Sequence, residues 1–459
     1  MLVVLAPLES ELTTCAAILV VSVRMPAHGR GCGEAGGTGS GRIPGTRGGG
    51  IAVSGEARWV RSPVSRVDRH WATNPNCKSV LVMVPHIVAG TRLFDLLALL
   101  ENDKRLQVVF TQPESWETWQ ATHDFLAVRG GVVLPWAQAR RERYDLVLAG
   151  SIRGMDEVNG PALLIPHGGG LAQYRRWRPE TTGESWAPVL NMDRDQLMRH
   201  GKVLAEAIVL THDDEMEVLT VACPPAVPYA VVAGDIAFDR MTASLPLRDH
   251  YRAELGLTPG QELVVVSSTW STASAFGRRP DLFDVVQREL PADRYRVVGL
   301  LHPNVWSHHG AWQVRTWLAD NMRSGLGLVP PEEGWRAALV GADHVIGDYG
   351  SVTTFAAGLG RPILRSAEPD GPLRPGSPSS VLAEVAPRWE PERPLEAQLA
   401  AARALCTPEL GSRVRGLLTS RPGAAAAILR EAMYRLLRLV EPDQSVVPLS
   451  LPAPTLLAS

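Results

Sequence analysis

The sequence has 459 residues, of which 45% are hydrophobic and 20% are charged, and its formal net charge is −2. Because a single hydrophobic core stops growing at about 250 to 300 residues, two domains are expected. The near-neutral charge provides no basic field of the kind that attracts polyanions, so nucleic-acid binding is disfavoured.

The five cysteines are scattered and form no Cys-x-x-Cys pair, so the sequence indicates neither a zinc site nor a disulfide framework. We expect no metal, no cofactor and a reducing environment. After the first 24 residues, no apolar run approaches the roughly 20 residues that cross a bilayer. The N-terminal apolar stretch is interrupted by Pro7, Glu9 and Glu11 and lacks the basic start of a signal peptide. A cytoplasmic protein is therefore predicted, with at most peripheral contact at the inner membrane face.

Residues 1–78 are expected to form a disordered, low-complexity extension. Glycine and arginine dominate residues 25 to about 75, as in Gly29-Arg30-Gly31, and no helical or strand periodicity is present. Two interpretations stay open. The arginines form a phosphate-attracting arm, or the segment is a non-native upstream extension.

Short apolar runs alternating with amphipathic stretches follow, which is the pattern of βαβ units. The runs are too short for helices and are rich in Val, Ile and Leu, so they predict strands. Residues 79–241 are therefore expected to form an N-terminal Rossmann-like domain, with 233–240 as a loop near its end. The predicted strands cover 80–84, 106–110, 145–148, 162–165, 208–210 and 230–232, and a helix covers 93–100.

A second series of the same kind predicts a C-terminal Rossmann-like domain with closing helices over 242–440, followed by a Pro-rich tail over 441–459. The fold class is α/β, with two helix-covered parallel sheets whose strand-end loops face a cleft between the domains. The predicted strands cover 263–266, 296–301, 344–346 and 363–364, and the predicted helices cover 248–255, 282–290, 312–322, 332–340, 352–357 and 424–439.

Ligands of such sheets bind just beyond the carboxyl ends of the strands, so polar residues in those loops are the candidate site. The strand over 162–165 is followed by Pro166-His167-Gly168-Gly169-Gly170. A histidine can take a proton from an attacking hydroxyl near neutral pH, and the glycines let backbone N–H groups approach a phosphate. We interpret His167 as a candidate general base. A tight turn with a capping histidine is the alternative.

His-Gly-Gly-Gly also occurs in the oxyanion holes of esterases, which need a Gly-x-Ser-x-Gly nucleophile elbow. No serine of this sequence has glycines at both required positions. A P-loop and a His-Glu-x-x-His motif are also missing, and no strand precedes the one Gly-x-Gly-x-x-Gly match, at Gly31 to Gly36. Hydrolase, P-loop, dinucleotide-binding and zinc-protease functions are thus disfavoured.

Three further strand ends carry polar residues. Proline fixes the turn Leu301-His302-Pro303-Asn304, where His302 is expected to donate to a phosphate oxygen. A hydroxyl-rich loop that includes Thr269 follows the strand over 263–266. At Asp348-Tyr349-Gly350-Ser351 a strand ends and a helix begins, which offers N–H groups, a hydroxyl and the positive end of a helix dipole to a diphosphate. Ordinary turn and helix-cap roles are the alternatives.

In this order, the loops resemble those of the CDP-glycerol glycerophosphotransferase family, a cell-wall polymer group with the glycosyltransferase-B fold. The resemblance covers about Val80 to Leu364. Five segments carry it: His167-Gly168 resembles the family's His-Gly loop, Gly234 to Asp239 its Gly-x-Pro-Arg-x-Asp turn, His302-Pro303 its His-Pro, Ala342-Asp343 through Ser351 its Asp-Tyr-Ser-Ser with the preceding strand, and Arg361-Pro362-Ile363 its Lys/Arg-Pro-Ile.

The resemblance implies a transferase that moves a glycerophosphate or glycosyl group from a nucleotide-diphosphate donor, such as CDP-glycerol, to an acceptor hydroxyl. The N-terminal domain would bind the acceptor and the C-terminal domain the donor. The implied catalytic residues are His167 and His302. The implied donor phosphate-binding residues are Ser351, Asp348, Gly350 and Thr269, and further cleft candidates are Gly168, Gly169, Asp239 and Arg361.

Departures from the family pattern keep alternatives open. Gly350 replaces the first serine of the family's pair, and Ile236-Ala237 replaces its Pro-Arg. The Lys-rich helices by which the family's polymerases sit on membranes are missing, which favours another acceptor over a teichoic-acid polymer. A sugar-nucleotide epimerase or hydrolase of the same fold, with His86, Asp213 and Asp214 as candidate acid/base groups, stays open. So does a non-catalytic nucleotide- or partner-binding protein.

Overall fold

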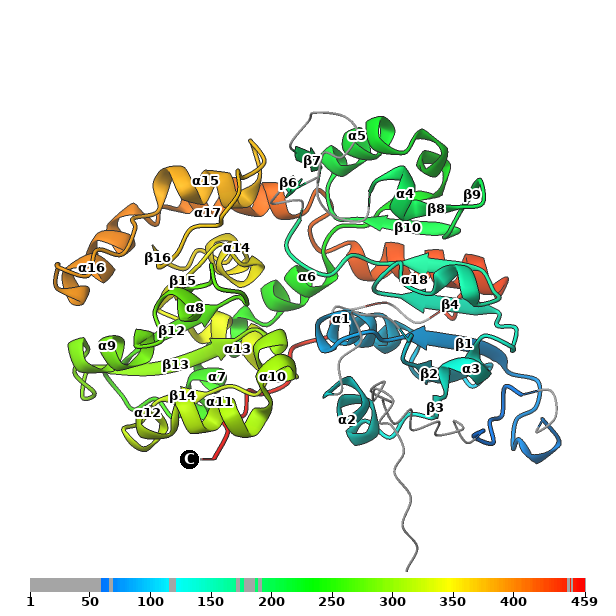
Figure 1. Ribbon diagram of the computed structural model, residues 1–459, viewed down its shortest axis with the longest axis horizontal. Coiled ribbons are helices and arrows are strands. Elements are labelled where there is room, and N and C mark those ends of the chain that lie inside the picture. Colours follow the sequence, from blue (N-terminus) through cyan, green and yellow to red (C-terminus); the bar gives the residue numbers. More distant parts are fainter. Residues whose placement is uncertain are drawn as a thin grey trace, which may run out of the picture. The chain divides into compact units, whose positions relative to one another are not determined.

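The computed structural model describes residues 59–65, 69–114, 121–170, 174–176, 186–188, 192–443, 446 and 449–458. All of them belong to one unit of the chain, Glu56–Ser459, which holds two parallel sheets with helices on both faces (Figure 1). The predicted α/β class with two Rossmann-like sheets is confirmed. Most of the extension predicted over 1–78 lies outside the described residues.

The first sheet has the strand order β11-β10-β5-β4-β1-β2-β3. All of its strand pairs are parallel. The chain builds outward from β1 to one side and then returns to its other side at β4, so the strand order reverses between β1 and β4. Loops diverge at such a switch point and leave a crevice. The strands are β1 (Lys78–Met83), β2 (Leu106–Thr111), β3 (Val133–Leu134), β4 (Leu146–Ala149), β5 (Ala162–Leu164), β10 (Ala207–Leu210) and β11 (Ala230–Val232).

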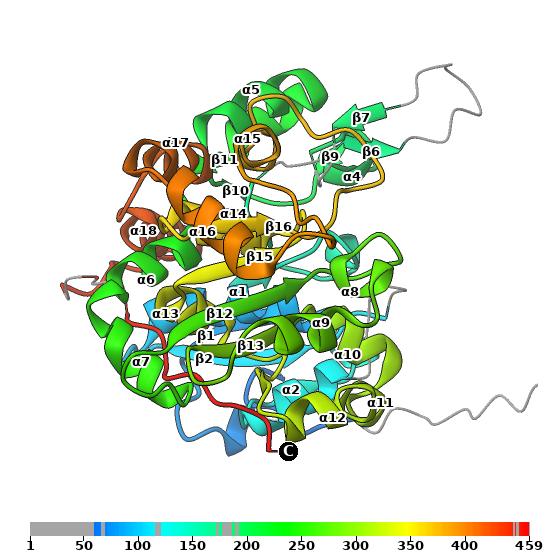
Figure 2. The same ribbon diagram turned by 90° about the vertical axis from the view of Figure 1, so that its left-hand side faces the viewer.

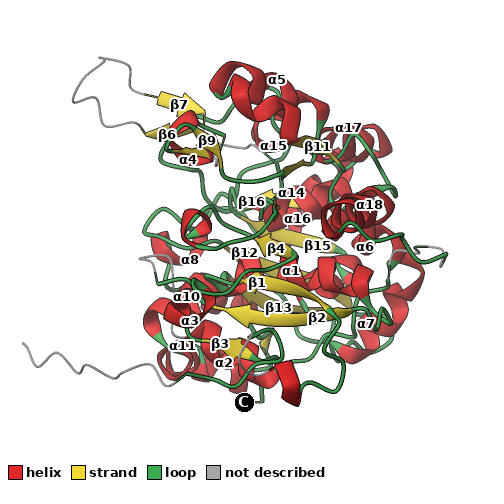
Figure 3. Cartoon of the chain, turned by 90° about the vertical axis from the view of Figure 1, so that its right-hand side faces the viewer, coloured by secondary structure: helices red, strands yellow, loops and turns green. Residues whose placement is uncertain are grey.

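Side chains of β1 alternate between two buried layers, as the strand pleat requires. Val80 and Val82 face one helix layer, and Leu81 and Met83 face the other. The first layer consists of α1 (Ile87–Leu97), α2 (Ala121–Val128) and α18 (Ala425–Leu437). The second consists of α3 (Trp136–Ala139), α4 (Arg194–Leu197) and α5 (Asp213–Ala222). Figure 3 shows helices on both faces of the sheet.

The second sheet has the order β14-β13-β12-β15-β16, again all parallel, and its order reverses between β12 and β15. The strands are β12 (Glu262–Ser268), β13 (Tyr295–Leu301), β14 (Gly327–Leu328), β15 (His344–Gly347) and β16 (Ile363–Arg365). One face is covered by α6 (Ile236–Ala243), α7 (Arg248–Glu254), α13 (Trp335–Gly341), α14 (Ser351–Gly358), α15 (Pro378–Val385) and α17 (Pro408–Leu418). The other is covered by α8 (Ala275–Arg278), α9 (Leu282–Glu289), α10 (Pro303–His309), α11 (Ala311–Trp317), α12 (Ala319–Arg323) and α16 (Leu395–Leu405), as Figure 2 shows.

Short elements complete the chain. Two antiparallel pairs, β6 (Tyr174–Arg176) with β7 (Trp186–Pro188) and β8 (Met198–Arg199) with β9 (Lys202–Val203), lie between β5 and β10 in the sequence. The 3₁₀ turns are η1 (Arg69–Trp71), η2 (Ala98–Leu100), η3 (Met155–Glu157), η4 (Pro224–Tyr229) and η5 (Leu245–Leu247).

Two predicted elements differ from the structure. The loop predicted over 233–240 contains the start of helix α6, because the Asp235 carboxylate accepts a hydrogen bond of 3.0 Å from the Phe238 N–H and caps the helix. The helix predicted over 312–322 is divided into α11 and α12. Leu318 lies between them, buried in the core and outside the α-helical backbone conformation.

The last helix returns to the first sheet. α18 contributes Ala425, Leu429 and Met433 to the same core cluster as β1, and it lies beside β4 in Figure 1. Asp239 of α6 accepts from the N–H groups of Gly423 and Ala425 at 2.7 and 3.1 Å and so fixes the start of α18. The contacts of α18 place it on the first sheet, whereas the sequence groups it with the second. The domain boundaries at 241 and 440 stay predictions.

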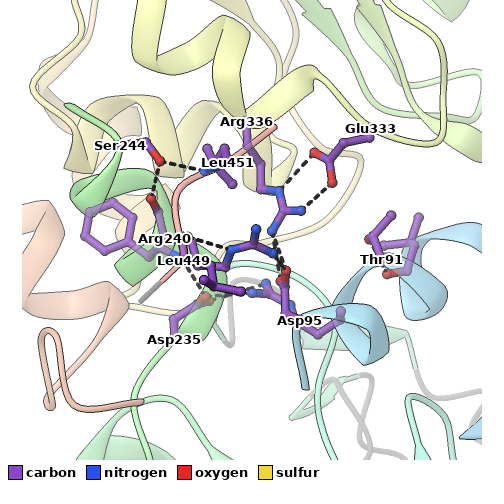
Figure 4. Close-up of polar contacts among 12 residues, drawn as sticks. Thr91, Asp95, Asp235, Arg240, Ser244, Glu333, Arg336, Leu449 and Leu451 are labelled. Carbon is purple, nitrogen blue, oxygen red and sulfur yellow. Dashed lines mark hydrogen bonds and ion pairs between the residues drawn. The ribbon is translucent and has the colours of Figure 1, made fainter. Parts of the chain in front are cut away.

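A buried network of charges joins the two sheets through α1, α6 and α13 (Figure 4). Asp95 of α1 accepts from Arg336 of α13 at 2.9 and 2.8 Å and also pairs with Arg240 of α6. Arg336 donates in turn to Glu333 at 3.1 Å. The side chains of Asp95 and Arg336 are only 1% and 3% exposed. Burial alone would raise the pKa of Asp95, but Arg336, Arg240 and Arg92 hold it below its ordinary value.

Replacing Asp95 with asparagine is expected to lower the free energy of unfolding by about 3 to 5 kcal/mol, because two buried guanidinium groups lose their counter-ion. Urea denaturation measures the loss. Asp320→Asn is the control, since its pair with Arg323 is exposed, and it should change stability by less than about 0.5 kcal/mol. An equally small change for Asp95→Asn would show that the network does not hold the sheets together.

Candidate functional site

A cleft of about 730 Å³, part of it open to solvent, lies where the strands of the second sheet end. The ends of β12, β13 and β15 form one wall, and Val88 and Thr91 of α1 form another. Residues Val329 to Pro331, after β14, and Trp335 add an apolar surface. Among the described residues that line the cleft, none is Lys, Arg, Asp or Glu.

The structure brings most of the predicted loops together here. Thr269, His302, Gly350 and Ser351 all line the cleft, although they follow three different strands. The His-Gly-Gly-Gly loop of the first sheet reaches the same place. A Cβ atom added at Gly169 would lie 2.9 Å from Thr354 Oγ1 and 3.2 Å from Ser351 Cβ, so this loop packs directly against the first turn of α14.

The start of α14 offers backbone N–H groups to the cleft. Gly350 is its N-cap, and no side chain of the described residues caps the helix. The helix dipole and the uncapped N–H groups favour an anion at this position. A Cβ atom at Gly350 would lie 3.1 Å from Asp348 Oδ1 and 3.3 Å from Thr269 Cβ, so a serine at this position would be crowded.

Asp348 connects two of the loops that form the cleft. Its carboxylate accepts from the N–H groups of Thr269, Gly350 and Ala275 at 2.8, 3.0 and 3.1 Å. The side chain is buried, and burial raises its pKa despite these hydrogen bonds. The carboxylate thus joins the loop after β12 to the start of α14, which makes Asp348 a positioning residue here; direct phosphate binding by it stays a prediction.

Three histidines from three strand ends meet beside the cleft. His86 follows β1, His167 follows β5 and His302 follows β13. The rings of His86 and His167 lie edge to face, with centroids 4.7 Å apart. Burial, and then the neighbouring His167, lowers the pKa of His302 to about 3. Burial, and then His167 and His302, lowers the pKa of His86 to about 3.

Hydrogen bonds to the backbone define which ring nitrogen carries the proton. Nδ1 of His302 accepts from the Asn304 N–H at 3.1 Å, so the proton of the neutral ring is on Nε2. Nδ1 of His167 lies 2.9 Å from the Gly150 carbonyl oxygen, which can only accept, so Nδ1 carries the proton and Nε2 is basic. In these tautomers His302 can donate through Nε2 and His167 can accept a proton at Nε2; their catalytic roles stay predictions.

Arg92 of α1 holds the histidine loop in position. Its guanidinium pairs with Asp235 at 2.7 Å and donates to the Gly168 carbonyl oxygen at 3.2 Å. Gly168 and Gly170 have φ angles of 124° and 77°, which glycine tolerates and other residues strain to adopt. Arg92 was not identified from the sequence, because this residue precedes the helix predicted over 93–100 and an arginine at such a place is ordinarily solvated, whereas α1 begins at Ile87 and includes it.

Two predicted cleft residues lie elsewhere. Arg361 precedes β16, at the amino end of the second sheet, and donates to the Val340 carbonyl oxygen at 2.7 Å. Burial lowers its pKa to about 10. Asp239 is engaged with the start of α18. Both side chains support packing, and neither lines the cleft.

The comparisons with known proteins extend these observations. No family model matches the chain, and no curated protein matches its sequence. A structure of the wall teichoic acid polymerase TagF matches with 11% identity and a TM-score of 0.52, over 80% of this chain and 91% of that one. A TagF variant soaked with CDPG matches with 11% identity and a TM-score of 0.50, over 81% and 92%.

A UDP-GlcNAc 2-epimerase from Neisseria meningitidis bound to UDP-GlcNAc aligns with 14% identity and a TM-score of 0.47, over 79% of this chain and all of that one. This last likeness is too slight to argue from. The two TagF structures decide the fold. The chain has the glycosyltransferase-B fold. At such low identity the likeness shows the fold alone, so function depends on the site.

The apolar surface of the cleft, formed by Val329 to Pro331 and Trp335, was not predicted from the sequence. It arises from β14, whose two residues are too few for a recognisable strand pattern, although Pro330-Pro331 marks its end. In the described part of the chain, no helix is long and apolar enough to cross a membrane. The described residues also contain no group of three or more His, Cys, Asp or Glu side chains that could hold a metal ion.

The lowered pKa of His302 predicts that the folded protein loses stability at acid pH. Below the ordinary histidine pKa of 6.5 the unfolded chain binds a proton at position 302, whereas the folded protein does so only near pH 3, so stability falls as the pH drops through this window. At pH 5 the loss is about 2 kcal/mol for this histidine.

His302→Asn keeps a helix-capping side chain and removes the titrating ring. Urea denaturation at pH 7 and pH 5 should therefore show a smaller loss of stability for the variant than for the wild type. His212→Asn, which removes a capping histidine from α5, is the control. An unchanged pH dependence in His302→Asn contradicts the assignment.

Proposed function

We propose that this protein is a glycosyltransferase-B transferase that moves a glycerophosphate or glycosyl group from a nucleotide-diphosphate donor of the CDP-glycerol kind to an acceptor hydroxyl. The observation that carries the proposal is that His302 and the uncapped start of α14 line one cleft, and that the loop of His167, which lines a separate pocket, packs against that start of α14 with a basic Nε2 on His167. These are the parts that phosphoryl transfer needs, since it depends on positioning and on stabilisation of developing charge.

In the glycerophosphate reaction, Nε2 of His167 takes the proton of the acceptor hydroxyl as its oxygen attacks the distal phosphorus. The bond between that phosphorus and the bridging oxygen breaks, and the nucleoside monophosphate leaves with the electron pair. The N–H of His302, the hydroxyl of Ser351 and the first N–H groups of α14 bind the phosphate oxygens. The proton stays on His167 until the product leaves.

The composition of the cleft suits a nucleotide without requiring a cationic side chain. Val329 to Pro331 and Trp335 provide the apolar surface on which a base can pack. The phosphates would then be held by N–H groups, hydroxyls and a helix dipole, which are fixed before the ligand binds and so act without reorganisation.

The epimerase alternative is less well supported. It needs an additional acid/base pair in the cleft, and Asp213 forms a two-point ion pair with Arg421 at 2.8 Å outside the cleft lining. His86 has its Nδ1 engaged by the Ala89 N–H. Asp214 lies 3.6 Å from Nδ1 of His212 and, like Asp213, is outside the cleft lining. None of the three residues predicted for that reaction therefore lines the cleft.

Calorimetric titration with CDP, UDP, CMP and CDP-glycerol tests the donor site. Saturable cytidine-nucleotide binding is expected, weakened roughly tenfold or more in Ser351→Ala and His302→Asn, because each loses a hydrogen bond to a charged group. Ser412→Ala, on the exposed side of α17, is the control and should bind like the wild type. Folded wild-type protein that binds none of these nucleotides would sink the proposal.

The role of His167 as general base is tested separately. His167→Gln is expected to bind nucleotide normally and to lose turnover of CDP-glycerol by about 10² to 10⁴-fold, since general-base catalysis contributes that much. Release of CMP from CDP-glycerol in the presence of candidate hydroxyl acceptors measures it. Turnover in the variant equal to that of the wild type contradicts the role. Binding without turnover in the wild type would instead favour the non-catalytic alternative.

A further inference from the structure

His86 lies beside the cleft, against the ring of His167, and has no role in the proposed reaction. It follows β1 at the switch point of the first sheet, and the residue is 9% exposed. Its Nδ1 accepts from the Ala89 N–H at 3.1 Å and caps α1. The proton of the neutral ring is therefore on Nε2. His86 cannot take up a second proton without giving up the helix cap, so it is committed to the uncharged state.

The ring of His86 confines His167 from one side. The two rings are 4.7 Å apart at an angle of 73°, and the Gly150 carbonyl oxygen after β4 engages Nδ1 of His167. His167 is thus held between the ends of two adjacent strands of the same sheet, β1 and β4.

The titratable and charged groups around His167 come from several elements. His86 and His302 lie near it at the ends of β1 and β13, and His167 contributes to the lowered pKa of both. Arg92 of α1 binds the neighbouring Gly168 carbonyl oxygen. Glu215 of α5 lines the same pocket as His167, and its carboxylate accepts from the Thr211 N–H and hydroxyl at 2.7 and 2.9 Å. Of these groups, only His86 has its ring packed on the ring of His167.

We propose that His86 is a positioning residue for His167: its ring keeps the imidazole in the orientation in which Nδ1 donates to the Gly150 carbonyl oxygen and Nε2 accepts a proton, and it gives His167 a neighbour that stays uncharged. The second property matters because a base that becomes a cation during the reaction cannot tolerate a second cation beside it. This inference rests on the proposed function, in which His167 is the base.

Nitrogen NMR of protein labelled with ¹⁵N-histidine tests the inference without any substrate. His86→Asn and His86→Ser both keep a capping oxygen for α1 and remove the ring. His212→Asn is the matched control, because His212 caps α5 through the same kind of Nδ1 contact, 3.1 Å from the Asp214 N–H. The signals of His167 are identified by their disappearance in His167→Gln.

In the wild type and in His212→Asn, His167 should show one neutral tautomer with the proton on Nδ1. In both His86 variants its two nitrogen signals should move towards each other as the tautomers mix. Turnover of CDP-glycerol should also fall roughly 10- to 100-fold in these variants, with nucleotide affinity unchanged, because a misplaced catalytic group costs about that much.

Unchanged His167 signals in both His86 variants overturn the inference. If the tautomer changes as expected but the wild type binds no nucleotide, the positioning role stands and the transferase proposal fails. If the wild type binds nucleotide and the His167 signals are the same in the His86 variants as in the wild type, the transferase proposal stands and this inference fails.

Discussion

The buried ion pairs of α1 are the constraint on which the rest of the structure depends. Arg92 and Asp95 lie three residues apart on one helix face, and each binds a charge from another part of the chain. Arg92 pairs with Asp235 at the start of α6, and Asp95 pairs with Arg336 of α13. Because unpaired buried charges are very costly, these pairs allow one main arrangement of the two sheets around α1.

The cleft follows from that arrangement. Arg92 also binds the Gly168 carbonyl oxygen, and the adjacent Gly169 packs on the first turn of α14. The loop of His167 from the first sheet is thereby brought beside the start of α14 from the second, the two parts that the proposed reaction uses. Both charges of α1 are engaged in ion pairs, and none of the described residues that line the cleft is charged. Phosphate binding in the proposed function would therefore depend on N–H groups, hydroxyls and neutral histidines rather than on positively charged side chains.

The sequence predicted what depends on local pattern. Buried parallel strands and the polar residues at their ends, such as His302 and Ser351, are visible because apolar runs and turn residues are adjacent in the chain. It could not predict that Arg92 and Asp95 are buried, since charged helix residues are usually solvated, nor that α18 returns to the first sheet. Arg361 was proposed as a cleft residue from its Arg-Pro-Ile pattern. It lies before β16, at the amino end of the sheet, whereas the cleft is at the carboxyl ends of the strands.

A crystal structure of the protein in complex with CDP would test the central claim, that both sheets contribute to one nucleotide site, most directly. The account predicts the diphosphate within hydrogen-bonding distance of the Ser351 N–H and of His302 Nε2, with the base against Val329 to Pro331 and His167 facing the distal phosphate. A diphosphate bound away from the start of α14, or out of reach of both His302 and the His167 loop, would contradict it.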